Sequence, residues 1–206
     1  MLYLQNILWG YTLTAVGLAL PGMVNMTAVK VSMNQGLRAG FRFSLGGALA
    51  LAVHAYLAIT FARFLSEHPY VLLYFKRAAL AIFMALSLVF FHLAKKPKQP
   101  REAYQQRENT PFIFGFLIMN MNMLNIPYLF ATGTLLEAKE WISVEPPNKW
   151  LFILGAALGA WSLLVVYAHF AGLIARRARF VARNLNYFLS GLFMLLAILQ
   201  MIQLYY

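Results

Sequence analysis

The chain has 206 residues, of which 62% are hydrophobic and only 11% are charged. Soluble domains carry roughly a quarter charged residues, so this composition excludes an ordinary soluble enzyme or binding domain. The formal net charge is +11. The Lys and Arg residues stand in short connections beside apolar stretches, where anionic lipid headgroups account for them. We therefore expect membrane lipid, and no nucleic acid, as a partner.

Six apolar stretches each provide the ~20 residues that a helix needs to cross the hydrocarbon core of a bilayer. The sequence therefore predicts an all-α membrane protein with six transmembrane helices and no separate catalytic domain. The predicted spans lie near Leu4–Val29, Gly40–Phe64, Tyr70–Leu93, Pro111–Leu136, Lys149–Ile174 and Leu185–Leu204.

The longest connection, residues 95–110, is polar and contains two prolines. This composition is typical of a flexible linker between two halves of a protein. We predict a first three-helix repeat at residues 1–94, a cytoplasmic linker at 95–110 and a second three-helix repeat at 111–206.

Lys and Arg are unevenly distributed between the two sides of the predicted bundle. The connections after spans 1, 3 and 5 carry twelve of the 17, and the other side carries five. The positive-inside rule then places the linker in the cytoplasm and both termini outside. No Lys or Arg precedes Lys30, so we expect the first stretch to remain as a span instead of acting as a cleaved signal. We expect a multi-pass protein of the bacterial inner (cytoplasmic) membrane.

Short similarities relate the two groups of three spans at nearly constant offsets of 106, 109 and 110 residues. An odd number of spans reverses the direction of insertion, so these similarities predict a 3+3 inverted-topology repeat. Secondary transporters use this architecture to move a central site from one face of the membrane to the other. The three pairs are Pro21 with Pro127, Leu45–Leu49 with Leu154–Leu158, and Phe83–Leu86 with Phe193–Leu196.

Two prolines interrupt spans 1 and 4, and polar residues gather beside both. A proline in a helix removes a backbone donor and frees a carbonyl, which is costly in lipid unless protein or water satisfies it. Paired breaks in an inverted repeat point to a binding site near the middle of the membrane. The alternative is a pair of structural kinks whose asparagines bond to their neighbours. The predicted substrate-binding residues are Pro21, Gly22, Asn25, Asn122, Asn125 and Pro127.

Ionisable residues are scarce in the predicted spans. The chain has no Asp, and its six Glu residues fall in connections or at span ends. The candidates for proton coupling are therefore His54 in span 2 and His169 in span 5. The absence of Cys and of an HExxH motif argues against redox or metal-dependent chemistry, so we expect no cofactor, no metal and no catalytic residues.

Several short motifs resemble the LysE/RhtB family of amino-acid exporters. They are Pro21-Gly22, Gly36-Leu37-Arg38-Ala39-Gly40, Leu45-Gly46, Phe114-Gly115, Asn125-Ile126-Pro127 and the spacing from Arg183 to Gly191. The resemblance implies six spans and export of amino acids. The chain departs from the family pattern at Met23, at Tyr128 and at Ala50-Leu51, where the family has proline, lysine and a Gly-Asp pair.

The leading hypothesis is a secondary transporter that exports amino acids or similar small polar metabolites by alternating access. The alternative is a subunit that keeps the LysE fold without transporting and acts as a scaffold in a larger membrane complex. The first hypothesis predicts a homo-oligomer without other subunits and a small polar substrate such as an amino acid, and the second predicts other membrane subunits as partners. A membrane-embedded enzyme is the third class, and it lacks the residues that such chemistry needs.

Overall fold

The described part of the chain consists of α-helices and their connections, without a strand. The computed structural model describes residues 2–67, 74, 77, 80–85, 87–89, 91–92, 110–175, 187, 190, 191, 194, 195, 197, 198, 201 and 202. Predicted spans 3 and 6 and the 95–110 linker lie largely outside these residues. The predicted all-α class is therefore confirmed, whereas the number of six spans stays a prediction.

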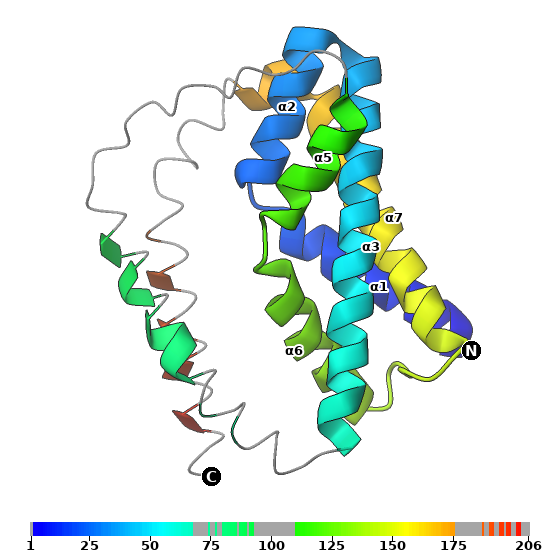
Figure 1. The fold of residues 1–206 in the computed structure, drawn as a ribbon, viewed down its shortest axis with the longest axis vertical. Helices are drawn as coiled ribbons and strands as arrows, with labels where there is room; N and C mark the ends of the chain where they lie inside the picture. Colours follow the sequence, from blue (N-terminus) through cyan, green and yellow to red (C-terminus); the bar gives the residue numbers. More distant parts are fainter. Residues whose placement is uncertain are drawn as a thin grey trace. The chain divides into compact units, whose positions relative to one another are not determined.

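Two of the predicted spans are each broken into a pair of helices. α1 (Leu2–Leu18) and α2 (Met23–Gln35) meet at an angle of 81°, and α5 (Pro111–Asn120) and α6 (Asn125–Ala138) meet at 66°. These pairs correspond to the spans predicted at Leu4–Val29 and Pro111–Leu136, both of which the sequence analysis expected to be interrupted. Figure 1 shows both bends, with α5 and α6 alongside the long helix α3.

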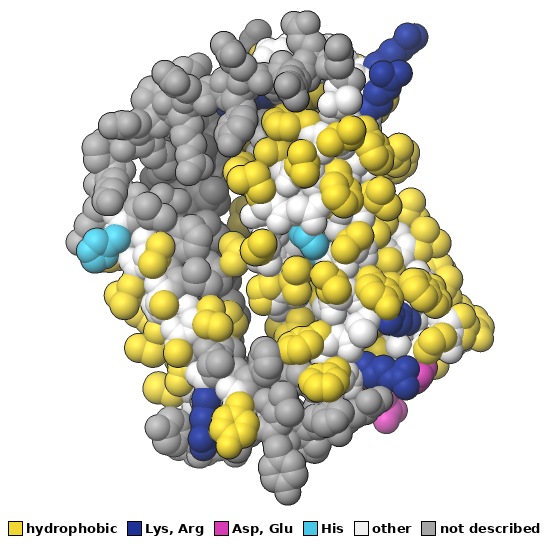
Figure 2. Space-filling model, viewed as in Figure 1, with side chains coloured by type: hydrophobic (Ala, Val, Ile, Leu, Met, Phe, Trp, Pro, Cys, Tyr) yellow, Lys and Arg dark blue, Asp and Glu magenta, His cyan; other side chains and the backbone are white. Residues whose placement is uncertain are grey.

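Two other predicted spans are continuous helices. α3 covers Leu37–Glu67 and α7 covers Asn148–His169. Both are long and apolar enough to cross a membrane, and the number of candidate spans among the described residues is four if each bent pair counts as one. Apolar side chains cover the visible face of these helices, and Lys, Arg and Glu gather toward its ends (Figure 2), as expected for a surface in contact with lipid.

The chain divides into two compact units, each of which contains parts of both sequence halves. The first unit comprises residues 1–64 and 107–178 and holds α1, α2, most of α3, α5, α6 and α7. The second comprises 65–106 and 179–206. In it, the Ser87 hydroxyl donates to the Ser190 carbonyl (3.1 Å) and the Ser190 hydroxyl donates to the Ser87 carbonyl (3.0 Å). The second unit is therefore joined by a reciprocal polar contact between predicted spans 3 and 6.

Glycines allow α1 and α7 to touch through their backbones. A Cβ atom on Gly10 would lie 2.2 Å from the Phe152 carbonyl oxygen, and one on Gly155 would lie 2.2 Å from the Ile7 carbonyl oxygen. Both distances are far below van der Waals contact. Small residues permit such close approach of membrane helices, where packing rather than the hydrophobic effect stabilises association.

The same arrangement recurs where α3 crosses α5. A Cβ atom on Gly115 would lie 2.0 Å from the Phe43 carbonyl oxygen, and one on Gly46 would lie 1.9 Å from the Phe112 carbonyl oxygen. Each crossing therefore contains a glycine on each helix that faces a backbone carbonyl of the other helix. The α1–α7 crossing adds a third, because a Cβ atom on Gly159 would lie 2.5 Å from the Tyr11 carbonyl oxygen.

The turn between α2 and α3 explains the Gly-x-Arg-Ala-Gly motif. Gly36 has φ +87°, a backbone conformation that residues with a side chain rarely adopt. Gly40 packs against Ala168 of α7, 2.9 Å from where its Cβ would be. The Ser32 hydroxyl donates to the Ala168 carbonyl (2.6 Å) and fixes α2 on α7. The motif thus reverses the chain and seats the turn on α7.

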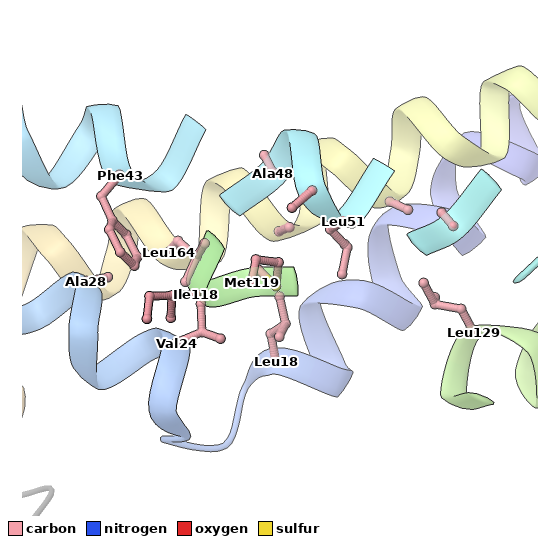
Figure 3. Packing of buried hydrophobic residues seen from close by; sticks show 14 of the residues in the cluster. Leu18, Val24, Ala28, Phe43, Ala48, Leu51, Ile118, Met119, Leu129 and Leu164 are labelled. Atoms are coloured by element: carbon pink, nitrogen blue, oxygen red, sulfur yellow. The ribbon is translucent and has the colours of Figure 1, made fainter. Parts of the chain in front are cut away.

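An apolar cluster fills the centre of the first unit. It takes Leu18 and Val24 from either side of the first break and Ile118 and Met119 from the end of α5. Figure 3 shows these side chains meeting Leu51 of α3 in the same cluster. The two broken spans are therefore joined by apolar packing beside their breaks.

We predict that Gly115→Ala lowers the thermal unfolding midpoint of the purified protein in detergent. The added Cβ meets backbone of α3, which cannot rotate away, so the helices must separate; overpacking of this kind costs about 1–3 kcal/mol. The matched control is Gly172→Ala, since nothing lies within 4 Å of a Cβ at that position. Equal midpoints for the two variants would contradict the backbone crossing.

Candidate functional site

The break between α1 and α2 is held by the side chain of Asn25. Its Nδ2 donates to the carbonyl of Leu18, the last residue of α1, and to the carbonyl of Leu20 (2.9 Å). The hydroxyl of Tyr167 on α7 donates to the Ala19 carbonyl (2.7 Å). Three consecutive carbonyls at the end of a broken helix are therefore satisfied by protein groups, as a span in lipid requires.

Asn25 retains an acceptor without a donor. The side chain is only 2% exposed, and its Oδ1 has no hydrogen-bond partner in the described part of the chain. Tyr167 lies beside it, but the single hydroxyl proton of that tyrosine is directed to Ala19. A buried acceptor that lacks a donor costs about 1–3 kcal/mol, which makes it a place where water or a ligand donor would bind favourably.

The second break places three asparagines close together. Asn122 Nδ2 donates to Asn125 Oδ1 (3.3 Å), and Asn125 Nδ2 points to the Met119 sulfur (3.3 Å). Asn120 Nδ2 donates to the carbonyl of Phe116, one turn back in α5. Asn125 is buried, whereas Asn120 and Asn122 are partly exposed. These amides therefore bond mostly to their own break, as the alternative of structural kinks predicted.

The two predicted prolines occupy different positions relative to their breaks. Pro21 lies inside the break between α1 and α2, as expected. Pro127 instead lies in the first turn of α6, where a helix tolerates proline, and the interruption comes before it, at Met121–Leu124. The Met123 carbonyl, which Pro127 leaves free, accepts from the Ile126 amide (3.2 Å). The breaks are therefore paired without being identical.

Tyr128 joins the two broken spans directly. Its hydroxyl donates to the Leu13 carbonyl of α1 (3.0 Å). Its ring lies against Gly17, where a Cβ would come within 2.7 Å. Helix α1 thus packs on α6, and α2 packs on α5. The sequence analysis identified Tyr128 only as a residue that replaces the lysine of the family. The tertiary structure shows that its hydroxyl binds the Leu13 carbonyl.

The two histidine candidates have different surroundings. His54, in the middle of α3, is 3% exposed, and its Nδ1 has no partner among the described residues. The Asn120 side chain is its interacting neighbour, so α3 meets the second break at this point. His169 is exposed at the last position of α7, against the ring of Phe170. Of the two, His54 alone belongs to the buried polar set around the breaks.

The connection between α6 and α7 is tied to α1 by a residue that the sequence analysis missed. Asn6 is fully buried; its Nδ2 donates to the Ser143 carbonyl (2.9 Å) and its Oδ1 accepts from the Ser143 amide (3.1 Å). Trp9 stacks on Trp141 with ring centroids 5.3 Å apart. Arg63 of α3 pairs with Glu145 at 3.1 Å. The connection therefore covers one end of the first unit.

The described residues contain no group of three or more His, Cys, Asp or Glu that could hold a metal ion. The polar groups at the breaks are amides, hydroxyls and backbone carbonyls. They can exchange hydrogen bonds with a neutral or zwitterionic solute but carry no fixed charge.

We predict that Asn6→Ala loosens the 139–147 connection. The change removes two hydrogen bonds and leaves the Ser143 amide and carbonyl without their partner, each at a cost of about 1–3 kcal/mol. Limited proteolysis in detergent should then cut this connection faster than in the unchanged protein. Gln5→Ala is the matched control because Gln5 is exposed. Equal cleavage rates for the two variants would contradict the anchoring role.

A family model described as LysE type translocator matches residues 15–204. The match covers most of the chain, which therefore belongs to the LysE type translocator family, and the resemblance seen in the sequence is confirmed. Membership supports a multi-pass membrane protein that transports a small solute, and not an enzyme. No curated protein and no solved structure matches the chain.

Proposed function

We propose that this LysE type translocator exports amino acids or similar small polar metabolites across the bacterial inner membrane by alternating access. The observation that carries the proposal is the pair of broken spans in the first unit, crossed so that α1 contacts α6 and α2 contacts α5. Discontinuous helices in membrane carriers expose helix ends and backbone groups to a substrate near the middle of the membrane.

The glycine crossings support a 3+3 inverted repeat. Gly10 and Ile7 of α1 correspond to Gly115 and Phe112 of α5 at an offset of 105 residues. At an offset of 109, Gly46 and Phe43 of α3 correspond to Gly155 and Phe152 of α7. Under this correspondence, the Gly10–Phe152 and Gly155–Ile7 contacts between α1 and α7 map onto the Gly115–Phe43 and Gly46–Phe112 contacts between α5 and α3. A repeat with two such rigid crossings can exchange conformations between its halves, as alternating access requires.

The residues at the breaks favour a neutral or zwitterionic substrate. Pro21, Gly22 and Asn25 form the first part of the proposed site, and Asn122, Asn125 and Pro127 form the second. None of these side chains is charged, so a cationic or anionic substrate side chain would have no counter-ion there. A zwitterionic head group instead requires matched donors and acceptors, which backbone and amide groups supply.

His54 is our proposed proton-coupling residue. An ionisable side chain within a span is costly and usually functional, and imidazole can change its charge at physiological pH. His54 is buried beside Asn120 at the second break, so its protonation would alter the site directly. The exposed His169 has no comparable contact with either break.

One observation favours the alternative of a scaffold subunit. Leu51 stands where the family has an acidic residue, and it is 1% exposed within the apolar cluster that joins the two broken spans. A carboxylate at this position would serve ion coupling, whereas leucine contributes only packing. A scaffold that retains the fold would purify with other membrane subunits in fixed stoichiometry.

The proposal is tested by efflux from liposomes that contain the purified protein and a radiolabelled mixture of the common amino acids. We expect loss of at least one amino acid at a rate well above that of protein-free liposomes. Asn125→Leu should reduce this rate at least tenfold, because it removes both hydrogen bonds of the buried amide at the second break. Asn34→Leu, on an exposed position of α2, is the matched control. Efflux equal to that of empty liposomes for every amino acid would refute the carrier and favour the scaffold.

The coupling residue is tested by imposing a pH gradient across the same liposomes. Glutamine retains hydrogen bonding but cannot take up a proton, so His54→Gln should exchange substrate at equilibrium without responding to the gradient. His169→Gln should still respond. If the response disappears in His169→Gln and persists in His54→Gln, the proton-coupling residue is His169 and the assignment of His54 is wrong.

A further inference from the structure

Helix α2 begins with free backbone donors. The amides of Met23, Val24 and Asn25 have no hydrogen-bond partner among the described residues, and no side chain caps the helix at Gly22. The first backbone bond of the helix runs from the Met26 amide to the Gly22 carbonyl (3.0 Å). Free first-turn amides and the positive end of the helix dipole attract anions such as carboxylates.

The corresponding end of α6 lacks this property. The Asn125 amide donates to the Asn122 carbonyl (3.2 Å), and the Ile126 amide donates to the Met123 carbonyl (3.2 Å). Pro127 has no amide proton to offer. Tight turns and a proline therefore occupy the first turn of α6, and the anion-attracting helix end occurs in the first break.

A second observation at the first break points to a ligand with a positive end. Among the described residues, no donor reaches the buried Asn25 Oδ1, and the backbone amide of the same residue belongs to the first turn of α2. Its Nδ2 holds the Leu18 and Leu20 carbonyls, which keeps the carboxamide within the break. Asn25 therefore contributes both a backbone donor and an unsatisfied side-chain acceptor to the first turn of α2.

Gly22 has no evident role in the packing of this conformation. Its φ of −106° is accessible to residues with a side chain, and a Cβ there would meet only the Leu20 carbonyl oxygen at 3.9 Å. The glycines at the helix crossings, in contrast, would place a Cβ within 2.5 Å of backbone. A glycine without a steric or conformational requirement, directly before free amides, leaves room for a ligand to approach the backbone.

We infer that the break between α1 and α2 binds the head group shared by α-amino acids, with the carboxylate on the first-turn amides of α2 and the ammonium on Asn25 Oδ1. The two charged groups of an α-amino acid are attached to one carbon, so they match backbone donors and a side-chain acceptor that belong to the same turn of α2. The inference rests on the proposed function and adds which break recognises the substrate, and through which atoms.

Gly22→Ser tests the carboxylate position. Serine at an N-cap position accepts hydrogen bonds from first-turn amides, so its hydroxyl would replace the substrate carboxylate. We expect an equal or higher thermal midpoint together with a roughly tenfold higher KM for amino-acid efflux from liposomes. Gly22→Ala adds bulk without a cap and should raise KM less. Gly172→Ser, at an open helical position, is the matched control and should leave KM unchanged.

The second arm uses derivatives of whichever amino acid leaves the liposomes fastest. Its α-amide lacks the carboxylate and its N-acetyl derivative lacks the ammonium, so both should compete at least tenfold more weakly than the parent. Equal competition by the derivatives, or a Gly22→Ser variant with a higher midpoint and an unchanged KM, would overturn the inference and leave the exporter intact. If no amino acid leaves the liposomes with the unchanged protein, the proposed function itself fails.

Discussion

The central constraint on this protein is that a helix broken inside a membrane must find partners for the backbone groups that it frees. Water is absent from the hydrocarbon core, so each unsatisfied group would cost several kcal/mol. At the first break, Asn25 and Tyr167 satisfy the carbonyls of Leu18, Ala19 and Leu20. At the second, the turns pair the carbonyls of Asn122 and Met123, and the Asn120 side chain bonds to the Phe116 carbonyl. The placement of polar residues follows from this need.

At the first break the freed carbonyls have hydrogen-bond partners, and the first-turn amides of α2 have none among the described residues. The carbonyls of Leu18, Ala19 and Leu20 are bonded, whereas the first amides of α2 and the buried Oδ1 of Asn25 have no partner in the part of the chain that the structure describes. A purely structural kink would be expected to pair both sets, because each orphan destabilises the fold. Groups left unpaired at a functional site can instead be satisfied by a substrate, so the cost to the empty protein becomes binding energy.

Rigid helix crossings complement these local breaks. Glycines bring α1 against α7 and α3 against α5 at backbone distance, so neither pair can shift without losing its packing. The Tyr128 hydroxyl joins α6 to α1, and the apolar cluster that contains Leu18 and Met119 joins the two broken spans beside their breaks. The Asn6–Ser143 bonds and the Trp9–Trp141 stack add a cover at one end.

The sequence determined the features that depend on composition and local covalent structure. Apolar length predicted the helices, and the absence of an amide proton predicted an interruption at Pro21. The short motifs predicted the LysE type translocator family, and its match over residues 15–204 confirms it. The motif at Gly36 also reflects a local requirement, a positive φ.

Only the tertiary structure decided which partner each polar group finds. The Asn6 bonds to Ser143 join residues 137 positions apart, and the Tyr128 bond to Leu13 joins residues 115 apart. No local pattern encodes such pairs. The helix is interrupted before Pro127, in the turns at Met121–Leu124, so Pro127 itself lies within the first turn of α6. Burial likewise separates His54 from His169, since the same side chain is buried in mid-helix α3 and exposed at the end of α7.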